Sequence, residues 1–161
     1  MENRKIRARI THGDINGVGY EVILKTFSDP TMLELCTPVV YGSPKVAAYH
    51  RKAMEIQTSF SIVNSAEEVQ DGRVNVVNCI EEELKVELTK PTPEAGKAAL
   101  AALERALADY REGLFDVLVT APINKHTIQS DAFHFPGHTE YIEERVGGGQ
   151  KALMILLKGD F

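Results

Sequence analysis

Apolar residues along the chain alternate between short β-like runs and stretches with helical spacing. The runs predict strands at residues 6–11, 38–42, 59–63, 74–77 and 115–121, with a last buried strand at 152–157. The helical spacing predicts helices at residues 20–27, 45–54 and 139–145. Strands that alternate with helices favour right-handed crossovers and a mostly parallel sheet. We therefore expect an α/β fold with helices on both faces of the sheet.

The clearest helix begins after Thr92, a residue type that caps helices, with Pro93 at its first position. Leu100, Leu103 and Leu107 lie on one face, and Gly113 ends the helix. The run at residues 115–121 follows directly and is rich in β-forming residues. It is predicted to be a central buried strand.

Composition and charge narrow the function. The chain has 161 residues, 43% of them hydrophobic and 25% charged, so residues 1–161 fit one folded domain of common size or the larger part of two small ones. A net charge of −5 argues against a general nucleic-acid or anionic-membrane partner, since those favour basic surfaces. The sequence has no apolar run of about 20 residues and no signal-peptide pattern, so we expect a cytoplasmic protein. Cys36 and Cys79 match no metal or redox spacing and are expected to be reduced thiols.

Candidate chemistry lies on loops after the strands, because ligands of parallel α/β sheets bind beyond the carboxyl ends of the strands. The first loop, residues 13–19, is rich in glycine and carries Asp14 and Asn16, but its spacing is not a dinucleotide or phosphate-loop motif. A turn without a ligand explains it equally well. The second loop, residues 120–125, places Lys125 near an expected helix start, where the helix dipole slightly disfavours a cation unless it meets an anionic ligand. A solvated surface lysine is the alternative.

The third loop, residues 133–140, contains a Pro-Gly turn, after which His138 or Thr139 would cap the next helix. A neutral imidazole and a hydroxyl there can hold a substrate oxygen or carboxylate. Pro136 and Gly137 rule out helical metal-ligand geometry for His134 and His138. The remaining candidates favour ordinary roles: a solvated face for Glu81, Glu82 and Glu83, and surface or core positions for His50 and His126.

Three motifs in register resemble one family: Gly13-Asp14-x-x-Gly17-x-Gly19-x-Glu21, Ala121-Pro122-Ile123-Asn124-Lys125 and Pro136-Gly137-His138-Thr139-Glu140. They are similar to the N-terminal part of the 4-hydroxythreonine-4-phosphate dehydrogenases (PdxA family). The resemblance implies an isocitrate/isopropylmalate-dehydrogenase-like fold of two α/β lobes and a homodimer. It also implies oxidation of 4-phosphohydroxy-L-threonine by NAD or NADP with a divalent metal. Decarboxylation to 3-amino-2-oxopropyl phosphate then follows in pyridoxal-phosphate biosynthesis.

By this resemblance His138 and Thr139 are substrate-binding residues, while Asp14, Asn16 and Lys125 are possible cleft residues. Tyr20 stands where the family has proline. The family's histidine metal ligands match no residue here, so the second lobe and those ligands are expected beyond this chain, which would be inactive alone. Three alternatives stay open: the same chemistry on 4-phosphoerythronate or 4-phosphothreonate, a non-catalytic binding or assembly module, and an acyl-phosphate transferase.

Overall fold

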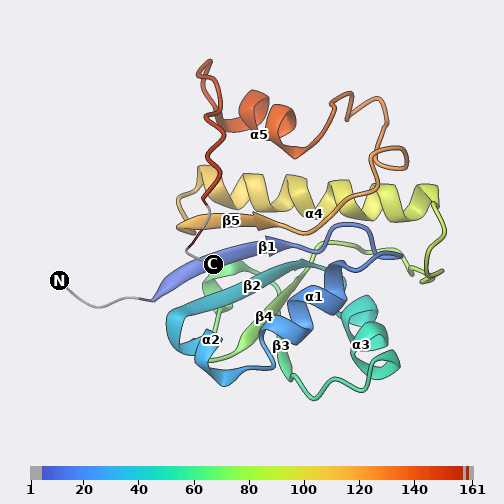
Figure 1. Ribbon diagram of the computed structural model, residues 1–161, viewed down its shortest axis with the longest axis vertical. Coiled ribbons are helices and arrows are strands. Elements are labelled where there is room, and N and C mark those ends of the chain that lie inside the picture. Colours follow the sequence, from blue (N-terminus) through green and yellow to red (C-terminus); the bar gives the residue numbers. More distant parts are fainter. Residues whose placement is uncertain (1–4, 158, 160–161) are drawn as a thin grey trace.

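A parallel sheet forms the centre of the molecule (Figure 1). The structure, a computed structural model, describes residues 5–157 and 159. Within these residues the sheet has five strands in the order β3-β4-β2-β1-β5, and every neighbouring pair is parallel. The strands are β1 (Ile6–Thr11), β2 (Cys36–Gly42), β3 (Phe60–Val63), β4 (Val74–Asn78) and β5 (Val117–Thr120). The predicted α/β class is confirmed.

Helices cover both faces of the sheet, as predicted (Figure 1). The helices are α1 (Gly19–Thr26), α2 (Pro30–Leu35), α3 (Pro44–Ala53), α4 (Pro93–Arg111) and α5 (His138–Val146), with a short 3₁₀ turn at Ala66–Glu68. On one face, Ile10 and Val40 pack with Ile23 of α1 and Val46 of α3. Because side chains alternate along a strand, the neighbouring strand residues point to the opposite face, towards α4.

Helix α4 joins two parts of the core. Its residues Ala102 and Ala106 pack on Val39 and Tyr41 of the sheet. Its leucine face packs in the other direction against α5 and the segment before it, where the buried members are Leu100, Leu103, Leu107, Ile128, Phe133 and Tyr141. Helix α4 therefore lies between the sheet and α5, as Figure 1 shows. Thr92 caps it through Ala95 N at 3.3 Å, as the sequence predicts.

The prediction that the run at 115–121 is a central buried strand is wrong. In the described part of the chain, β5 is the end strand and pairs only with β1. Val117 and Val119 lie beside Ala8 and Ile10, so they point to the face of α1, where they remain 42% and 47% exposed. An apolar β-branched run shows that a strand forms, but it does not reveal how many strands flank it.

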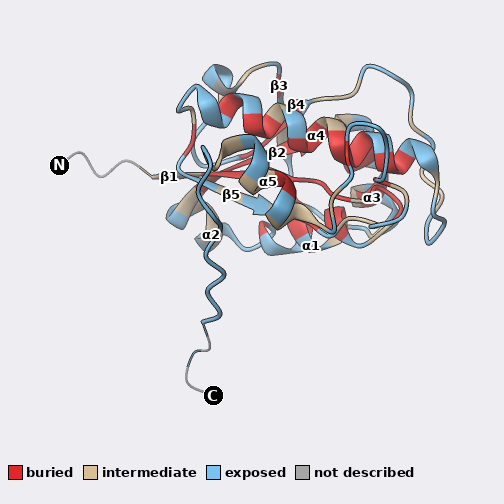
Figure 2. Cartoon of the chain, turned by 90° about the horizontal axis from the view of Figure 1, so that it is seen from above, coloured by how far each residue is buried: buried red, intermediate tan, exposed pale blue. Residues whose placement is uncertain are grey.

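The predicted buried strand at residues 152–157 is also not observed. These residues form no helix or strand, and Leu153, Leu156 and Leu157 are 83%, 94% and 90% exposed. Figure 2 shows the segment extending away from the body of the molecule. No strand of the described residues pairs with it, and an apolar run needs such a partner to become a buried strand.

Membrane insertion through a helix finds no support in residues 5–157 and 159. None of the helices described there combines the length and the apolar composition that spanning a bilayer requires.

Candidate functional site

The first and second loops meet at the edge of the sheet where the strands end. Strands β1 and β5 are parallel neighbours, so the loops after Thr11 and Thr120 leave side by side (Figure 1). Gly13 has a φ of +68°, and a Cβ atom at this position would lie 2.3 Å from the Pro122 carbonyl oxygen. The Asp14 N–H donates to the same oxygen at 2.9 Å. Only glycine permits this close backbone contact, which fixes the two loops against each other.

Lys125 lies on a single tight turn instead of at the start of a helix. Residues 125–128 form the turn, and the next helix begins only at His138. The Asn124 side chain accepts hydrogen bonds from His126 N at 3.0 Å and Thr127 N at 3.2 Å. This Asx-type cap satisfies the turn locally, and it leaves the Lys125 side chain exposed. The prediction that a helix starts near Lys125 is therefore wrong.

The third loop lies against this turn. The Gln129 side chain donates to the Lys125 carbonyl at 3.1 Å and to the Phe135 carbonyl at 2.9 Å, which ties the two segments together. A Cβ atom on Gly137 would lie 3.9 Å from the Lys125 Cε atom. The lysine side chain thus passes beside the start of α5. Sequence reasoning missed Gln129, whose only signal was its place between the two loops.

Helix α5 begins at His138, but neither His138 nor Thr139 caps it. The N-cap is Gly137, which has no side chain to accept a hydrogen bond. The first backbone N–H groups of the helix are therefore not satisfied by a side-chain cap. The predicted cap is wrong because the helix already begins at His138, so both His138 and Thr139 lie inside its first turn.

The electrostatics of His138 favour a neutral imidazole. Burial lowers the pKa of His138 below its ordinary value, and the positive charge of Lys125 lowers it further. A neutral imidazole can donate one hydrogen bond and accept another. Beside it, the Lys125 ammonium and the N–H groups of α5 attract negative charge. This corner can hold an anionic group and hydrogen-bond a neighbouring oxygen.

Thr139 faces a different space. It lines a pocket of about 440 Å³ between α5 and the segment 150–154, together with Glu143 and Lys151. Neither His138 nor Lys125 lines that pocket. The structure thus brings Lys125 and His138 together and places Thr139 on the adjoining side of α5. A shared ligand for His138 and Thr139 stays a prediction.

Asp14 and Asn16, from the first loop, differ in whether their side-chain atoms are free to contact a ligand. Asp14 is half-buried, and its Oδ1 accepts the Asn16 N–H at 2.9 Å. Asn16 is 2% exposed, and its amide bonds to residues 87–92. A ligand contact by the Asn16 side chain would have to replace these bonds. The geometry therefore favours a structural role for Asn16, while Asp14 retains a carboxylate oxygen for other contacts.

His12 is a buried residue of this region that sequence reasoning did not single out. It is fully buried directly after β1, and its Nε2 lies 3.0 Å from the Ala98 carbonyl oxygen, so Nε2 carries the proton. Its Nδ1 has no hydrogen-bond partner among the described residues. Burial lowers the pKa of His12 to about 4. Its only sequence signal was its position between a strand and Gly13.

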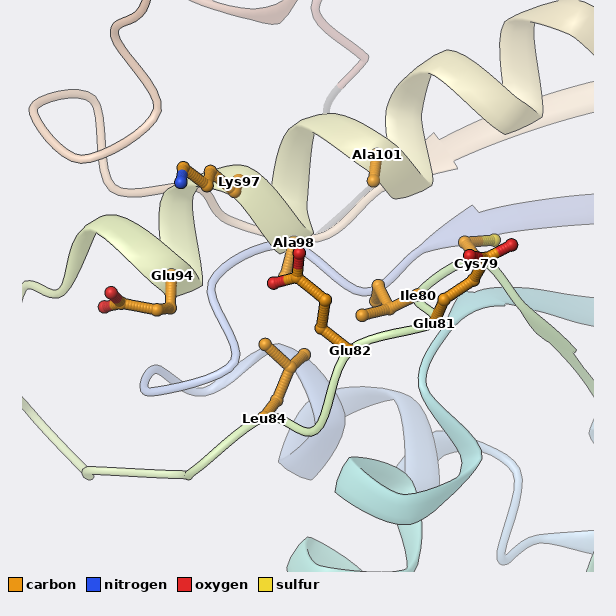
Figure 3. Close-up of a pocket in the computed structure, with 9 residues that line it drawn as sticks. All are labelled: Cys79, Ile80, Glu81, Glu82, Leu84, Glu94, Lys97, Ala98 and Ala101. Atoms are coloured by element: carbon orange, nitrogen blue, oxygen red, sulfur yellow. The ribbon is translucent and has the colours of Figure 1, made fainter.

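A separate pocket of about 340 Å³ lies between α4 and the segment after β4 (Figure 3). Cys79 and Leu84 line one side, and Glu94, Lys97 and Ala101 line the other. Burial raises the pKa of the Cys79 thiol to about 12, so this cysteine is a poor nucleophile. None of the five predicted site residues lines this pocket.

The residues present do not form a complete metal site. Across residues 5–157 and 159, no three His, Cys, Asp or Glu side chains come close enough together to hold an ion. The described residues therefore give a divalent metal no full set of ligands.

Comparison with known proteins identifies relatives that are longer than this chain. The chain is 74% identical over all 161 residues to a 4-hydroxythreonine-4-phosphate dehydrogenase of Bacteroides thetaiotaomicron, of which it covers 44%. It is 29% identical over 150 residues to a D-threonate 4-phosphate dehydrogenase of Cupriavidus necator, covering 91% of the chain and 45% of the relative. The chain thus spans somewhat less than half the length of these relatives.

A solved structure supports the fold. The crystal structure of a 4-hydroxythreonine-4-phosphate dehydrogenase from Burkholderia phymatum superposes with a TM-score of 0.81 at 26% identity, covering 92% of this chain and 46% of that one. The sequence profile described as "Pyridoxal phosphate biosynthetic protein PdxA" matches residues 34–161. The chain therefore belongs to the PdxA family.

Proposed function

We propose that this chain is part of an oxidoreductase that oxidises 4-phosphohydroxy-L-threonine with NAD or NADP. The oxidised product then loses CO₂ to give 3-amino-2-oxopropyl phosphate, a step of pyridoxal-phosphate biosynthesis. The observation that carries the proposal is the juxtaposition of Lys125 and His138 at the carboxyl edge of the sheet. The 74% identity to a protein named for this reaction supports the choice of substrate.

The substrate carries a phosphate, a carboxylate, an amine and a hydroxyl group, and the site residues match several of these. The Lys125 ammonium pairs with an anionic group of the substrate, a charge-assisted contact. The neutral His138 imidazole hydrogen-bonds a substrate oxygen, and the Thr139 hydroxyl contacts the substrate from the adjoining side of α5. Asp14, held beside Pro122, presents a carboxylate to the same edge. These roles orient the substrate for hydride loss.

The cofactors act with parts of the protein other than this corner. When bound, NAD or NADP accepts the hydride from the carbon that is oxidised. The described residues do not hold a divalent metal, so we assign no step in this chain to it, and its ligands are proposed to lie in the remaining part of a longer protein. We further propose a homodimer as the working form.

A second candidate keeps the chemistry and changes the substrate. The Cupriavidus necator relative is named for D-threonate 4-phosphate, a phosphorylated acid without the amine. Lys125 and His138 would recognise its anionic groups equally well, so these two residues do not separate the substrates. A non-catalytic binding module is the rival from another class, and it predicts ligand affinity that is indifferent to His138→Ala.

The site assignment is tested by two variants, each with a matched control. The protein used in the assay is a chimera in which residues 1–161 replace the matching part of the Bacteroides thetaiotaomicron relative. Lys125→Ala is compared with Lys97→Ala, an exposed lysine in the pocket of Figure 3. His138→Ala is compared with His134→Ala, an exposed histidine four residues earlier. The measured quantity is kcat/KM for 4-phosphohydroxy-L-threonine.

We expect Lys125→Ala and His138→Ala each to lower kcat/KM by roughly 10- to 100-fold, the loss of one hydrogen bond to a charged group. Lys97→Ala and His134→Ala should stay within about twofold, since they touch neither loop contact. If Lys97→Ala is the more damaging lysine variant, the ligand binds in the pocket beside Cys79 and the site assignment is wrong.

A further inference from the structure

Asn16 holds a second segment of the chain against the first loop. We call residues 87–92 the strap; it runs from the segment after β4 to the start of α4. The Asn16 Oδ1 accepts the Glu87 N–H at 2.8 Å, and its Nδ2 donates to the Lys90 carbonyl at 2.9 Å and the Thr92 Oγ1 at 3.1 Å. The Asn16 carbonyl also accepts the Thr89 N–H at 2.9 Å. One buried residue thus binds the strap at four points.

The strap needs this support because its own conformation is unfavourable. Thr89 has a φ of +67°, a region that a β-branched residue rarely adopts. Such a conformation persists only where surrounding contacts impose it. The contacts that Asn16 makes on both sides of Thr89 supply that constraint.

The strap ends at the residue that caps α4. The Thr92 Oγ1 accepts one hydrogen bond from the Ala95 N–H and another from the Asn16 Nδ2. One turn later, a Cβ atom on Gly96 would lie 1.8 Å from the Thr127 carbonyl oxygen, so α4 rests directly on the turn that carries Lys125. Asn16 is therefore connected to Lys125 through the start of α4.

We infer that Asn16 is a positioning residue, whose amide fixes the strap and the first turn of α4 and thereby sets Lys125 beside His138. The functional meaning of this position rests on the proposed function. The inference itself concerns the geometry of the chain, so it is tested without substrate as well as with it.

The chain contains a matched control for Asn16. Asn75 is fully buried, and its amide also ties a loop to the core, donating to the Pro38, Gln70 and Arg73 carbonyls and accepting from Gln70 N. It lies on β4, and these hydrogen bonds reach none of the three loops of the candidate site. Asn75→Ala therefore removes a comparable set of bonds outside those loops.

The experiment compares the Asn16→Ala and Asn75→Ala variants of this chain. NMR titration measures the pKa of the His138 imidazole, and amide hydrogen exchange measures the protection of the strap. Asn16→Asp is measured beside them, because it keeps the side-chain volume and the acceptor for Glu87 N if the alanine variant fails to fold. Among the described residues, Lys125 lowers the pKa of His138, and the Glu140 Oε2 would lie 3.8 Å from a Cβ on the preceding residue, Gly137. His138→Gln identifies the resonance.

We expect the Asn16 variants to raise the pKa of His138 towards its ordinary value, because Lys125 moves away, and to speed exchange of the Glu87 and Thr89 amides at least about tenfold. Asn75→Ala should change neither. In the chimera, Asn16→Ala should lower kcat/KM while Asn75→Ala does not. A His138 pKa that is the same in Asn16→Ala and Asn75→Ala overturns the inference. An inactive wild-type chimera would instead refute the substrate, and the titration would still decide the role of Asn16.

Discussion

His12 lies fully buried where β1 ends, and its surroundings hold it neutral. Its Nε2–H donates to the Ala98 carbonyl. The ring of Tyr20 packs edge-on against the imidazole, with 5.4 Å between the two ring centroids. Gly42 leaves room for both rings, since a Cβ there would lie 2.8 Å from the His12 Cγ atom. A proton on Nδ1 would have no acceptor among the described residues, so charging this imidazole costs folding free energy.

The stability of the chain should therefore fall in acid because of His12. Its pKa is about 4 in the folded chain and 6.5 in its ordinary state, so the unfolded chain binds more protons between these values. The free energy of unfolding should decrease as the pH falls from about 6.5 to about 4, by up to about 3 kcal/mol from this residue. Urea unfolding at several pH values measures this.

The control for this prediction is a comparison of two glutamine variants. His12→Gln should flatten the pH dependence in that window, whereas His126→Gln, at an exposed position, should leave it unchanged. His50, whose pKa burial also lowers, contributes a remaining slope in both variants. An equal slope in wild type and His12→Gln would show that His12 does not control acid stability.

At the scale of elements, α4 connects the sheet, the strap and the Lys125 turn. The helix carries a glycine at the point of closest approach, and that glycine faces the backbone of Thr127 and Ile128. Backbone atoms cannot rotate away as a flexible side chain does. The position of α4 over the second loop therefore depends on the absence of a side chain at residue 96.

Replacing Gly96 tests this contact. Alanine gains up to about 1 kcal/mol in helix propensity, but the clash with backbone forces a shift that costs about 1–3 kcal/mol or more. Because the approach is to a backbone oxygen at 1.8 Å, we take the upper end of this range and expect Gly96→Ala to destabilise the chain by about 2 kcal/mol net. Lys97→Ala, at the exposed neighbouring position, should change stability by less than about 0.5 kcal/mol. Equal stability of the two variants in thermal unfolding would refute the close contact.

Most elements were predictable because their signals are local. Thr92 and Pro93 mark the start of α4, and the alternation of strands with helices indicates a parallel sheet. The failures concern relations between distant residues. The sequence of residues 115–121 does not show that β5 has one neighbour, and the apolar character of residues 152–157 does not supply a strand to pair with.

The same distinction applies to the site. The loop rule for parallel sheets predicted that Asp14 and Lys125 lie on loops after strands, but it did not predict that these two loops meet, which follows from the pairing of β1 with β5. The amide of Asn16 was expected in the cleft, yet its bonds go to a strap 71 to 76 residues away, which no local pattern reveals. His12 and Gln129 escaped notice for the same reason, since their partners are set by packing.

At the scale of the whole molecule, the described residues present an edge of loops and several exposed apolar side chains. The loops with Asp14 and Lys125 share the carboxyl edge of the sheet (Figure 1), and the loop before His138 lies against the Lys125 turn. Val117 and Val119 of β5 are exposed on the sheet, while the apolar side chains of residues 153–157 are exposed on a segment that extends away from the body of the molecule (Figure 2). Since the PdxA relatives are about twice as long as this chain, the proposed reaction concerns a longer protein.

The proposed function is tested by reduction of NAD or NADP by the chimera, with a divalent metal and 4-phosphohydroxy-L-threonine. On the basis of the 74% identity to a protein named for this substrate, we expect its kcat/KM to be at least about tenfold higher than that of D-threonate 4-phosphate or 4-phosphoerythronate, a difference of about 1.4 kcal/mol. We expect no turnover by residues 1–161 alone. No reduction by the chimera, or a preference for the acids without the amine, would contradict the proposed function.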